Sequence, residues 1–122
     1  MAHDFPSEIT EAVVHRPWPM PRSPWIMTQS WHDLLFAHWP IGAKTLRDRV
    51  PKPLELDQFE SQAWVSIVPF HMTNVVPRGV PALPWVSAFP ELNVRTYVRV
   101  GDRPGVYFFS LDAGSAVAVA VA

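Results

Sequence analysis

Three polar side chains recur at alternate positions of one short stretch, and their types are suited to chemistry. Glu91, Asn93 and Arg95 alternate with Leu92 and Val94. Because successive side chains of a β-strand point to opposite faces, the three polar residues would share one face. A carboxylate can act as a general acid or base, and a guanidinium can pair with an anion. The spacing therefore indicates a row of hydrogen-bonding groups that can also pair with a charged molecule.

Two environments are compatible with this polar row. An antiparallel sheet commonly has one solvated face, where these residues would be ordinary surface groups. If the sheet curls into a barrel, the same face would line a cavity that holds one small ligand. The neighbouring aromatic residues favour a pocket, since ligand sites combine apolar walls with a few placed polar groups. These aromatic residues include Trp64, Phe89, Tyr97 and Phe108.

Other catalytic patterns are absent from the sequence. The five histidines show no HxH, HxxH or HExxH spacing, so neither a metal site nor a cofactor is predicted. His32 and Asp33 beside Ser30 resemble part of a catalytic triad, but adjacent residues of a strand face opposite ways. The sequence has no cysteine, no GxSxG turn and no glycine-rich nucleotide loop.

The polar row belongs to a predicted β-hairpin over residues 89–112, where two strand-like runs flank a short polar turn. A register that separates the apolar face from the polar face pairs Gly101 with Val106. It also places Arg95 directly opposite Asp112 and leaves residues 102–105 as the loop. Asp112 thereby joins Glu91, Asn93 and Arg95 as a candidate ligand-binding residue.

The rest of the chain predicts a mainly antiparallel β fold with little helix. Residues 42–50 are the best helix candidate, because Ala43, Leu46 and Val50 share one face. Pro69 implies an edge or a bulge in its strand, and fourteen prolines argue against long interior helices. Strands are predicted at residues 54–59 and 63–73, with a turn at 60–62. Residues 34–37 are compatible with a buried strand or a helical turn, and we favour the strand because Pro40 follows.

Composition limits the functional classes. A chain of 122 residues that is 48% hydrophobic and only 17% charged should fold as one domain. The net charge of -1 without a basic patch argues against nucleic-acid binding. The N-terminus lacks a secretory signal, and the longest apolar run, AVAVAVA, is too short for a membrane helix. We therefore expect a cytoplasmic protein without a membrane partner.

Three regions are expected along the chain. Residues 1–24 form an extended arm rich in proline and tryptophan, with Trp18 and Trp25 as its anchors. Residues 25–113 form the β domain, and residues 114–122 form a truncated or atypical tail. Unpaired strand edges of a partial sheet would also favour association into oligomers.

Long collinear blocks of the sequence resemble the YqjF-like family, bacterial proteins built on a domain of unknown function. The blocks are WIMTQSWHDLLFAHWPI, LELDQFESQAWVSIVPF and FPELNVRTYVRVGDRPGVYFFSLDA, within a match from about Trp25 to Ala113. The resemblance implies a fold similar to that of acetoacetate decarboxylase, an antiparallel β-barrel with a central cavity. This chain would then be the N-terminal half of the barrel, and the Glu91 row would face the cavity.

The resemblance does not transfer the decarboxylase reaction, which needs a strand lysine that forms a Schiff base. The chain offers only Lys44, on the predicted helix, and Lys52, between two prolines. We therefore expect a site for a small anionic or carbonyl-bearing molecule, with Arg95 as charge partner and Glu91 as acid or base. Whether this site catalyses a reaction is left open. The alternatives are a non-catalytic β scaffold that acts through protein contacts and a truncated fragment without function.

Overall fold

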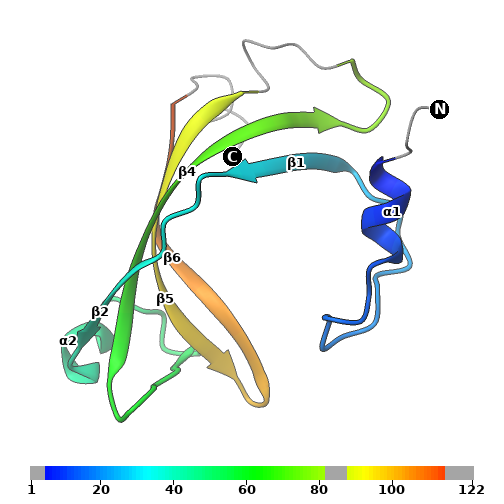
Figure 1. Cartoon of the computed structure of the whole chain (residues 1–122). Helices are drawn as coiled ribbons and strands as arrows, with labels where there is room; N and C mark the ends of the chain where they lie inside the picture. Colours follow the sequence, from blue (N-terminus) through cyan, green and yellow to red (C-terminus); the bar gives the residue numbers. More distant parts are fainter. Residues whose placement is uncertain (1–4, 82–87, 115–122) are drawn as a thin grey trace.

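The computed structural model describes residues 5–81 and 88–114, and it shows a strongly curved antiparallel sheet of six strands (Figure 1). The prediction of a mainly antiparallel β fold with little helix is confirmed. No helix among the described residues is long and apolar enough to cross a membrane. Most of the predicted tail, residues 115–122, lies outside the described residues. The elements are α1 (Phe5–Glu11), β1 (Met27–His32), β2 (Ala37–Ile41), α2 (Ala43–Arg47), β3 (Glu55–Leu56), β4 (Ala63–Pro77), β5 (Phe89–Val100) and β6 (Arg103–Ala113).

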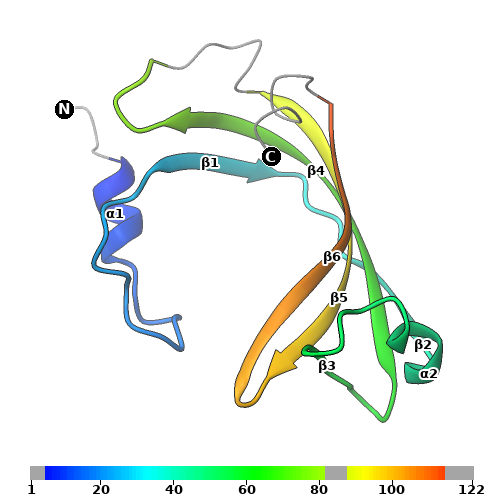
Figure 2. The ribbon, with the colours of Figure 1, turned by 180° about the vertical axis from the view of Figure 1, so that it is seen from behind.

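The two longest strands, β4 and β5, form the centre of the sheet. Residues 65–72 of β4 pair with residues 89–96 of β5. β1 and β2 pair with β4, whereas β3 and β6 pair with β5. Among the described residues nothing joins β6 to β1 or β2, so the sheet is open and the predicted barrel is not closed. Figures 1 and 2 show the curve open on the side that faces the N-terminal arm.

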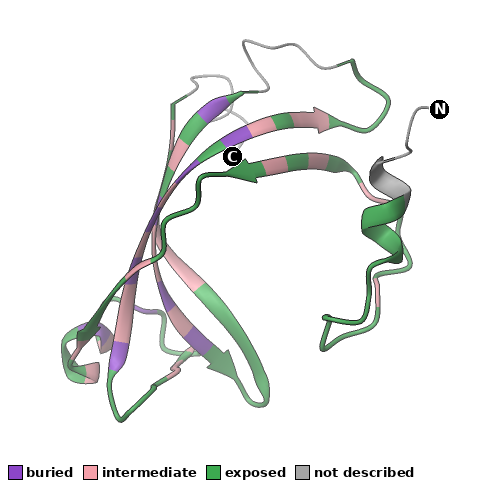
Figure 3. Ribbon diagram, viewed as in Figure 1, coloured by how far each residue is buried: buried purple, intermediate pink, exposed green. Residues whose placement is uncertain are grey.

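The apolar core lies along the contact between β4 and β5. Val68, Phe70, Met72 and Phe89 form one buried cluster, and Figure 3 shows most of the buried segments on these two strands. Full burial of one such side chain stabilises the fold by roughly 1.5–3 kcal/mol. The ring of Trp31 in β1 lies 4.7 Å from the ring of Phe70, which extends the cluster towards the edge.

Pro69 lies in the middle of β4 without breaking the strand. β1 pairs with β4 from residue 71 onwards and β2 pairs with residues 63–67, so residues 68–70 face no strand on that side. The amide of Leu35 donates a hydrogen bond to the Pro69 carbonyl across this gap, at 3.3 Å. In a strand, the amide and carbonyl of one residue point the same way, so the missing amide hydrogen of Pro69 also falls there. The prediction of a local edge is confirmed.

The predicted strand at residues 34–37 is misplaced. β2 begins at Ala37, where that strand was expected to end, and runs through Pro40 to Ile41. β2 is an edge strand, and a proline is tolerated there because its missing donor need not serve a ladder on both sides. The predicted strand at residues 54–59 is likewise reduced to β3, Glu55–Leu56.

The predicted helix at residues 42–50 is confirmed in a shorter form as α2. Leu46 and Val50 are 3% and 4% exposed, as the one-face pattern predicts. Arg47 then stabilises the chain after the helix, because its guanidinium donates to three backbone carbonyl oxygens. The acceptors are Val50 at 2.8 Å, Pro51 at 2.9 Å and Leu54 at 2.7 Å.

The β5–β6 hairpin is confirmed, but its turn differs from the predicted loop of residues 102–105. Val100 pairs with Arg103, which leaves only Gly101 and Asp102 in the turn. Gly101 has a φ of +61°, and Asp102 is not among the residues with positive φ. This matches a type II′ turn, which places glycine at its first central position and suits the twist of a hairpin. Pro104, expected in the loop, lies in β6.

The predicted register of the hairpin is therefore wrong. Arg95 lies opposite Phe108, whereas Leu92 lies opposite Asp112, and Phe109 is the extra residue between these two registers. Because opposed residues share a face and neighbours alternate, Asp112 lies on the other face of the sheet from Arg95. Asp112 is also exposed, and it leaves the candidate site.

The N-terminal arm crosses the open side of the curve (Figure 2). The guanidinium carbon of Arg103, at the start of β6, lies 5.4 Å from the centre of the Trp18 ring. That of Arg78, just after β4, lies 5.0 Å from the Trp25 ring. Cation–π contacts of this kind contribute about 0.5–1 kcal/mol at exposed sites. Both tryptophans thus contact arginines of the sheet region.

The turn gives a direct test of the observed register. We expect Gly101→Ala to destabilise the protein by about 1–2 kcal/mol, because a β-carbon disfavours positive φ. A β-carbon at Gly101 would meet no atom within 4 Å, so the cost comes from the backbone alone. Urea unfolding of the purified chain would measure it.

Gly105→Ala is the matched control, since Gly105 lies in β6 without positive φ and with equally open space. It should be neutral or slightly stabilising, by less than about 1 kcal/mol. The predicted loop of residues 102–105 would regain support if Gly105→Ala cost as much as Gly101→Ala.

Candidate functional site

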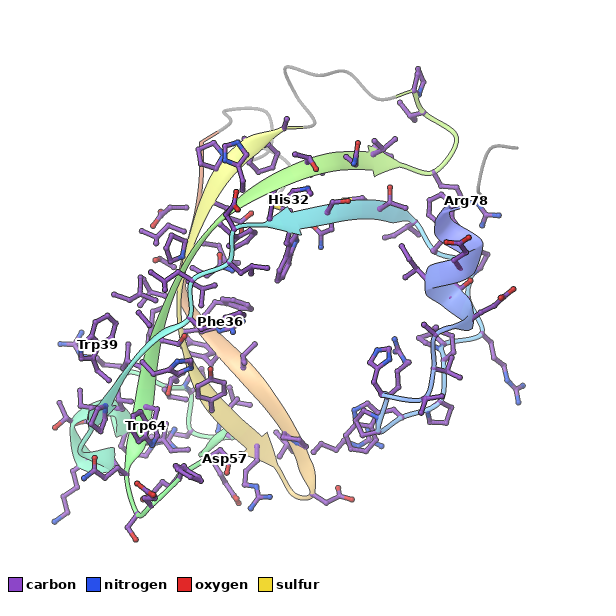
Figure 4. The ribbon with its side chains drawn as sticks, viewed as in Figure 1. His32, Phe36, Trp39, Asp57, Trp64 and Arg78 are labelled. Atoms are coloured by element: carbon purple, nitrogen blue, oxygen red, sulfur yellow. The ribbon has the colours of Figure 1, made fainter. Side chains whose placement is uncertain are left out.

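The observed pairing places the predicted polar row on the concave face of the sheet. Figure 4 shows Phe36 on the concave side and Trp39 on the convex side. The guanidinium carbon of Arg95 lies 5.3 Å from the centre of the Phe36 ring, so Arg95 is on the concave side too. Glu91 and Asn93 alternate in step with Arg95 along β5 and share its face. Their partners across β4 are Phe70, Val68 and Ser66, respectively.

Three buried polar atoms on this face have no hydrogen-bond partner among the described residues. They are Oγ of Ser66, Oδ1 of Asn93 and Nε of Arg95. Ser66 is 0% exposed and Asn93 is 2% exposed, and Ser66 lies directly opposite Arg95. Each unpaired buried polar group costs roughly 1–3 kcal/mol, and native proteins keep few of them. Three such atoms in neighbouring residues therefore distinguish this part of the concave face.

Arg95 supplies the positive charge of the site. Its side chain is partly exposed and lies over the ring of Phe36, and it makes no ion pair within the described ranges. A guanidinium stacked on an aromatic ring can still donate hydrogen bonds in its own plane to a carboxylate. The predicted partner, Asp112, lies on the convex face. The charge of Arg95 is therefore available to an anionic ligand.

Glu91 lies four residues before Arg95 on β5, between Phe70 of β4 and Ala113 of β6. Burial raises the pKa of Glu91 above its ordinary value of 4.5, because the charged form loses hydration. A carboxyl group with a raised pKa is better suited to act as a proton donor at moderately acidic pH. This fits the acid or base role assigned to Glu91 from the sequence.

A histidine–tyrosine pair extends the polar row and was not predicted. Nε2 of His38 lies 2.6 Å from the hydroxyl oxygen of Tyr97, and the two rings are nearly parallel at 14°. His38 lies opposite Ser66, which in turn lies opposite Arg95. The sequence signal was the alternation of Tyr97 with Arg95. The partner comes from β2, 59 residues away, and only the strand register reveals it.

Other groups capable of chemistry lie elsewhere. Lys44 and Lys52 are exposed on α2 and after it, not on the concave face. A depression of about 360 Å³ beside α2 includes Arg47, but that guanidinium already donates to three carbonyls. No three histidine, aspartate or glutamate side chains of the described ranges lie close enough to hold a metal ion.

The sequence has relatives among known proteins. A family model described as an uncharacterized conserved protein, domain of unknown function 2071, matches residues 28–122. The Uncharacterized protein YqjF of Bacillus subtilis (strain 168) is 50% identical over 111 residues, which cover 91% of this chain. Those residues cover 46% of that relative, so the chain spans about half its length. No solved structure matches the chain.

The unpaired serine predicts a stabilising substitution. Ser66→Ala removes a buried hydroxyl that has no partner, and we expect it to stabilise the protein by about 1 kcal/mol. Thr96→Val is the matched control on the convex face. Thr96 is 0% exposed, and its hydroxyl donates to the Trp64 carbonyl at 2.7 Å, so its loss should destabilise by roughly 1–3 kcal/mol. Denaturant unfolding of both variants would show the opposite signs; equal losses would mean that the Ser66 hydroxyl has a partner in solution.

The raised pKa of Glu91 predicts a pH-dependent stability. The folded protein binds this proton more tightly than the unfolded chain, so its contribution is full below the ordinary value of 4.5 and is lost as pH rises through the raised value. Glu91→Gln removes this loss, and the variant should gain stability relative to the parent between pH 4 and pH 7. Urea unfolding at both pH values would measure the difference. The exposed Glu55→Gln is the control, and a gain equally large there would refute the assignment to burial at Glu91.

Proposed function

The chain belongs to the YqjF-like family, and from this premise and the concave face of its sheet we propose that it binds a small anionic or carbonyl-bearing molecule. Arg95 is the charge partner of the ligand, and Glu91, four residues away on the same face of β5, is the acid or base. One observation carries the proposal: the unpaired polar atoms of Ser66 and Asn93 belong to neighbours of Arg95, whose guanidinium has an unpaired Nε and no ion pair within the described ranges.

The charge of the ligand follows from Arg95. A guanidinium and a carboxylate form charge-assisted hydrogen bonds that are roughly twice as strong as neutral ones. The surroundings of Arg95 on the concave face are apolar, because Phe36 and Phe108 are its neighbours there. An apolar environment screens charges less than water does and therefore strengthens this pairing. An anionic group on the ligand would therefore be held by Arg95 in preference to water alone.

An apolar body on the ligand follows from the exposed rings. Phe36 is 51% exposed and Trp31 is 42% exposed. Trp31 packs on Phe70, which lies opposite Glu91, so both rings belong to the concave face. Ligand sites commonly join such apolar walls to a few polar groups. A small carboxylate with an aromatic or aliphatic body suits this surface.

Ser66 and Asn93 are the polar neighbours of Arg95 on this face, since Ser66 lies opposite Arg95 and Asn93 is two residues along β5. Their unpaired oxygen atoms are buried, so a ligand reaches them only if neighbouring side chains move. After such a movement, they can form polar contacts to the ligand.

We further propose that the curved sheet is the N-terminal part of a barrel similar in fold to acetoacetate decarboxylase. The open curve of the sheet, its unpaired edges and the 46% coverage of the YqjF relative support this. Closure would exclude water from the concave face and strengthen pairing with Arg95. A solved structure of the whole YqjF relative would test the proposal. A separate second domain that leaves this sheet open would overturn it.

Two probes test the charge partner: 4-phenylbutanoate and its neutral amide, 4-phenylbutanamide. We expect Arg95→Ala to weaken binding of the acid by about ten- to a hundredfold, the range for a charge-assisted hydrogen bond. Binding of the amide should change much less. Calorimetry or ligand-observed NMR with the 122-residue chain would provide both affinities.

Arg99→Ala is the matched control, because Arg99 is an exposed arginine on the same strand. Its removal changes the net charge equally and should leave both affinities within about twofold. Equal losses in the two variants would reduce the effect to general electrostatics. No binding of either probe would favour the alternative, a non-catalytic scaffold.

A further inference from the structure

We infer that Tyr97 is a second binding residue of the concave face, and that the ligand is accordingly a small oxo- or hydroxy-carboxylate. This inference rests on the proposed function, since it assumes that the carboxylate pairs with Arg95. It adds a requirement for a second oxygen on the ligand, which Tyr97 recognises.

The spacing along β5 carries the first step. Arg95 and Tyr97 are two residues apart on one strand, so they share the concave face at a separation of about 7 Å. Both side chains are partly buried, and the contact between the Tyr97 hydroxyl and His38 is exposed. A molecule of a few carbon atoms can place a carboxylate on the guanidinium and a second oxygen at the hydroxyl.

Stacked rings fix the position of the hydroxyl relative to the guanidinium. His38 lies between Phe36 and Tyr97, with ring centres 6.4 Å and 5.8 Å away and interplanar angles of 16° and 14°. Phe36 also carries Arg95 on its ring face. One column of three rings therefore links the hydroxyl of Tyr97 to the guanidinium of Arg95. A fixed spacing between two polar groups is what allows a surface to select a bifunctional ligand.

The tautomer of His38 decides which kind of ligand oxygen Tyr97 can bind. If Nε2 of His38 carries the hydrogen, it donates to Tyr97, and the Tyr97 hydroxyl is free to donate to a ligand carbonyl. If Nε2 is bare, it accepts the Tyr97 hydrogen, and the Tyr97 oxygen can accept from a ligand hydroxyl. Both tautomers give the ligand oxygen a partner. The first selects an oxo acid and the second a hydroxy acid.

A double-mutant-type cycle tests the inference by removing the Tyr97 hydroxyl from the protein and the second oxygen from the ligand. The probes are 4-oxo-4-phenylbutanoate, 4-hydroxy-4-phenylbutanoate and 4-phenylbutanoate, which differ only at the fourth carbon. We expect Tyr97→Phe to weaken binding of the oxo or hydroxy acid by about three- to tenfold, as for one hydrogen bond. Binding of 4-phenylbutanoate should stay within about twofold.

Tyr107→Phe is the matched control, because Tyr107 lies opposite Thr96 on the convex face. It removes the same hydroxyl type and should leave the affinity for every probe unchanged. His38→Ala should reduce the preference for the oxygenated probe, and His38→Gln, which keeps a donor and an acceptor, should restore part of it. Circular dichroism and thermal melting of each variant establish that it is folded.

The outcomes separate the two proposals. If Arg95→Ala weakens binding of all three acids but Tyr97→Phe does not discriminate between them, this inference is wrong and the proposed function stands. If Arg95→Ala affects none of them, the proposed function is wrong as well. The inference is supported if Tyr97→Phe selectively loses affinity for the oxygenated probes and Tyr107→Phe does not. The two His38 variants should then differ, with His38→Gln keeping more of the preference than His38→Ala.

Discussion

The antiparallel contact between β4 and β5 is the constraint on which the rest of this structure depends. Each of the other described strands pairs with β4 or β5, and none of them pairs with another. The buried cluster of Val68, Phe70, Met72 and Phe89 fixes this contact at one register, since a slip by one residue would move each side chain to the other face. The same register places Ser66 opposite Arg95 and Val68 opposite Asn93. Core and candidate site are therefore consequences of one pairing.

The sequence predicted the strands of this contact well, because long runs of β-favouring residues leave few alternatives. It also identified Glu91, Asn93 and Arg95 as one row, since alternation along a single strand is a local property. Pairing between strands is not local, and there the prediction failed. Sorting residues into an apolar and a polar face assumed that only apolar residues are buried, whereas Asn93 and Thr96 are buried on opposite faces. The bulge at Phe109 then offset the register in a way that hydrophobicity does not encode.

The histidine–tyrosine pair shows the same limit. Tyr97 was identified from the sequence only as an aromatic residue near the polar row, and nothing local connects it to His38. Their contact depends on β2 and β5 both pairing with β4, with Ser66 between them. Residues that meet across a central strand can be found from sequence only after both registers are known. The functional constellation is thus less predictable than the fold that carries it.

The energetics of the concave face are consistent with the binding role that we propose. One unpaired buried polar atom costs roughly 1–3 kcal/mol, which is a sizeable part of a typical stability of about 5–15 kcal/mol. Alanine at position 66 would fill the same space without burying an unpaired hydroxyl. The cluster around Val68 shows that β4 accepts apolar residues on this face. The convex face follows the opposite rule, because the buried hydroxyl of Thr96 is paired with a backbone carbonyl. Local departures from polar satisfaction are expected where function requires them. The departures in this chain lie at and next to Arg95, which makes no ion pair within the described ranges.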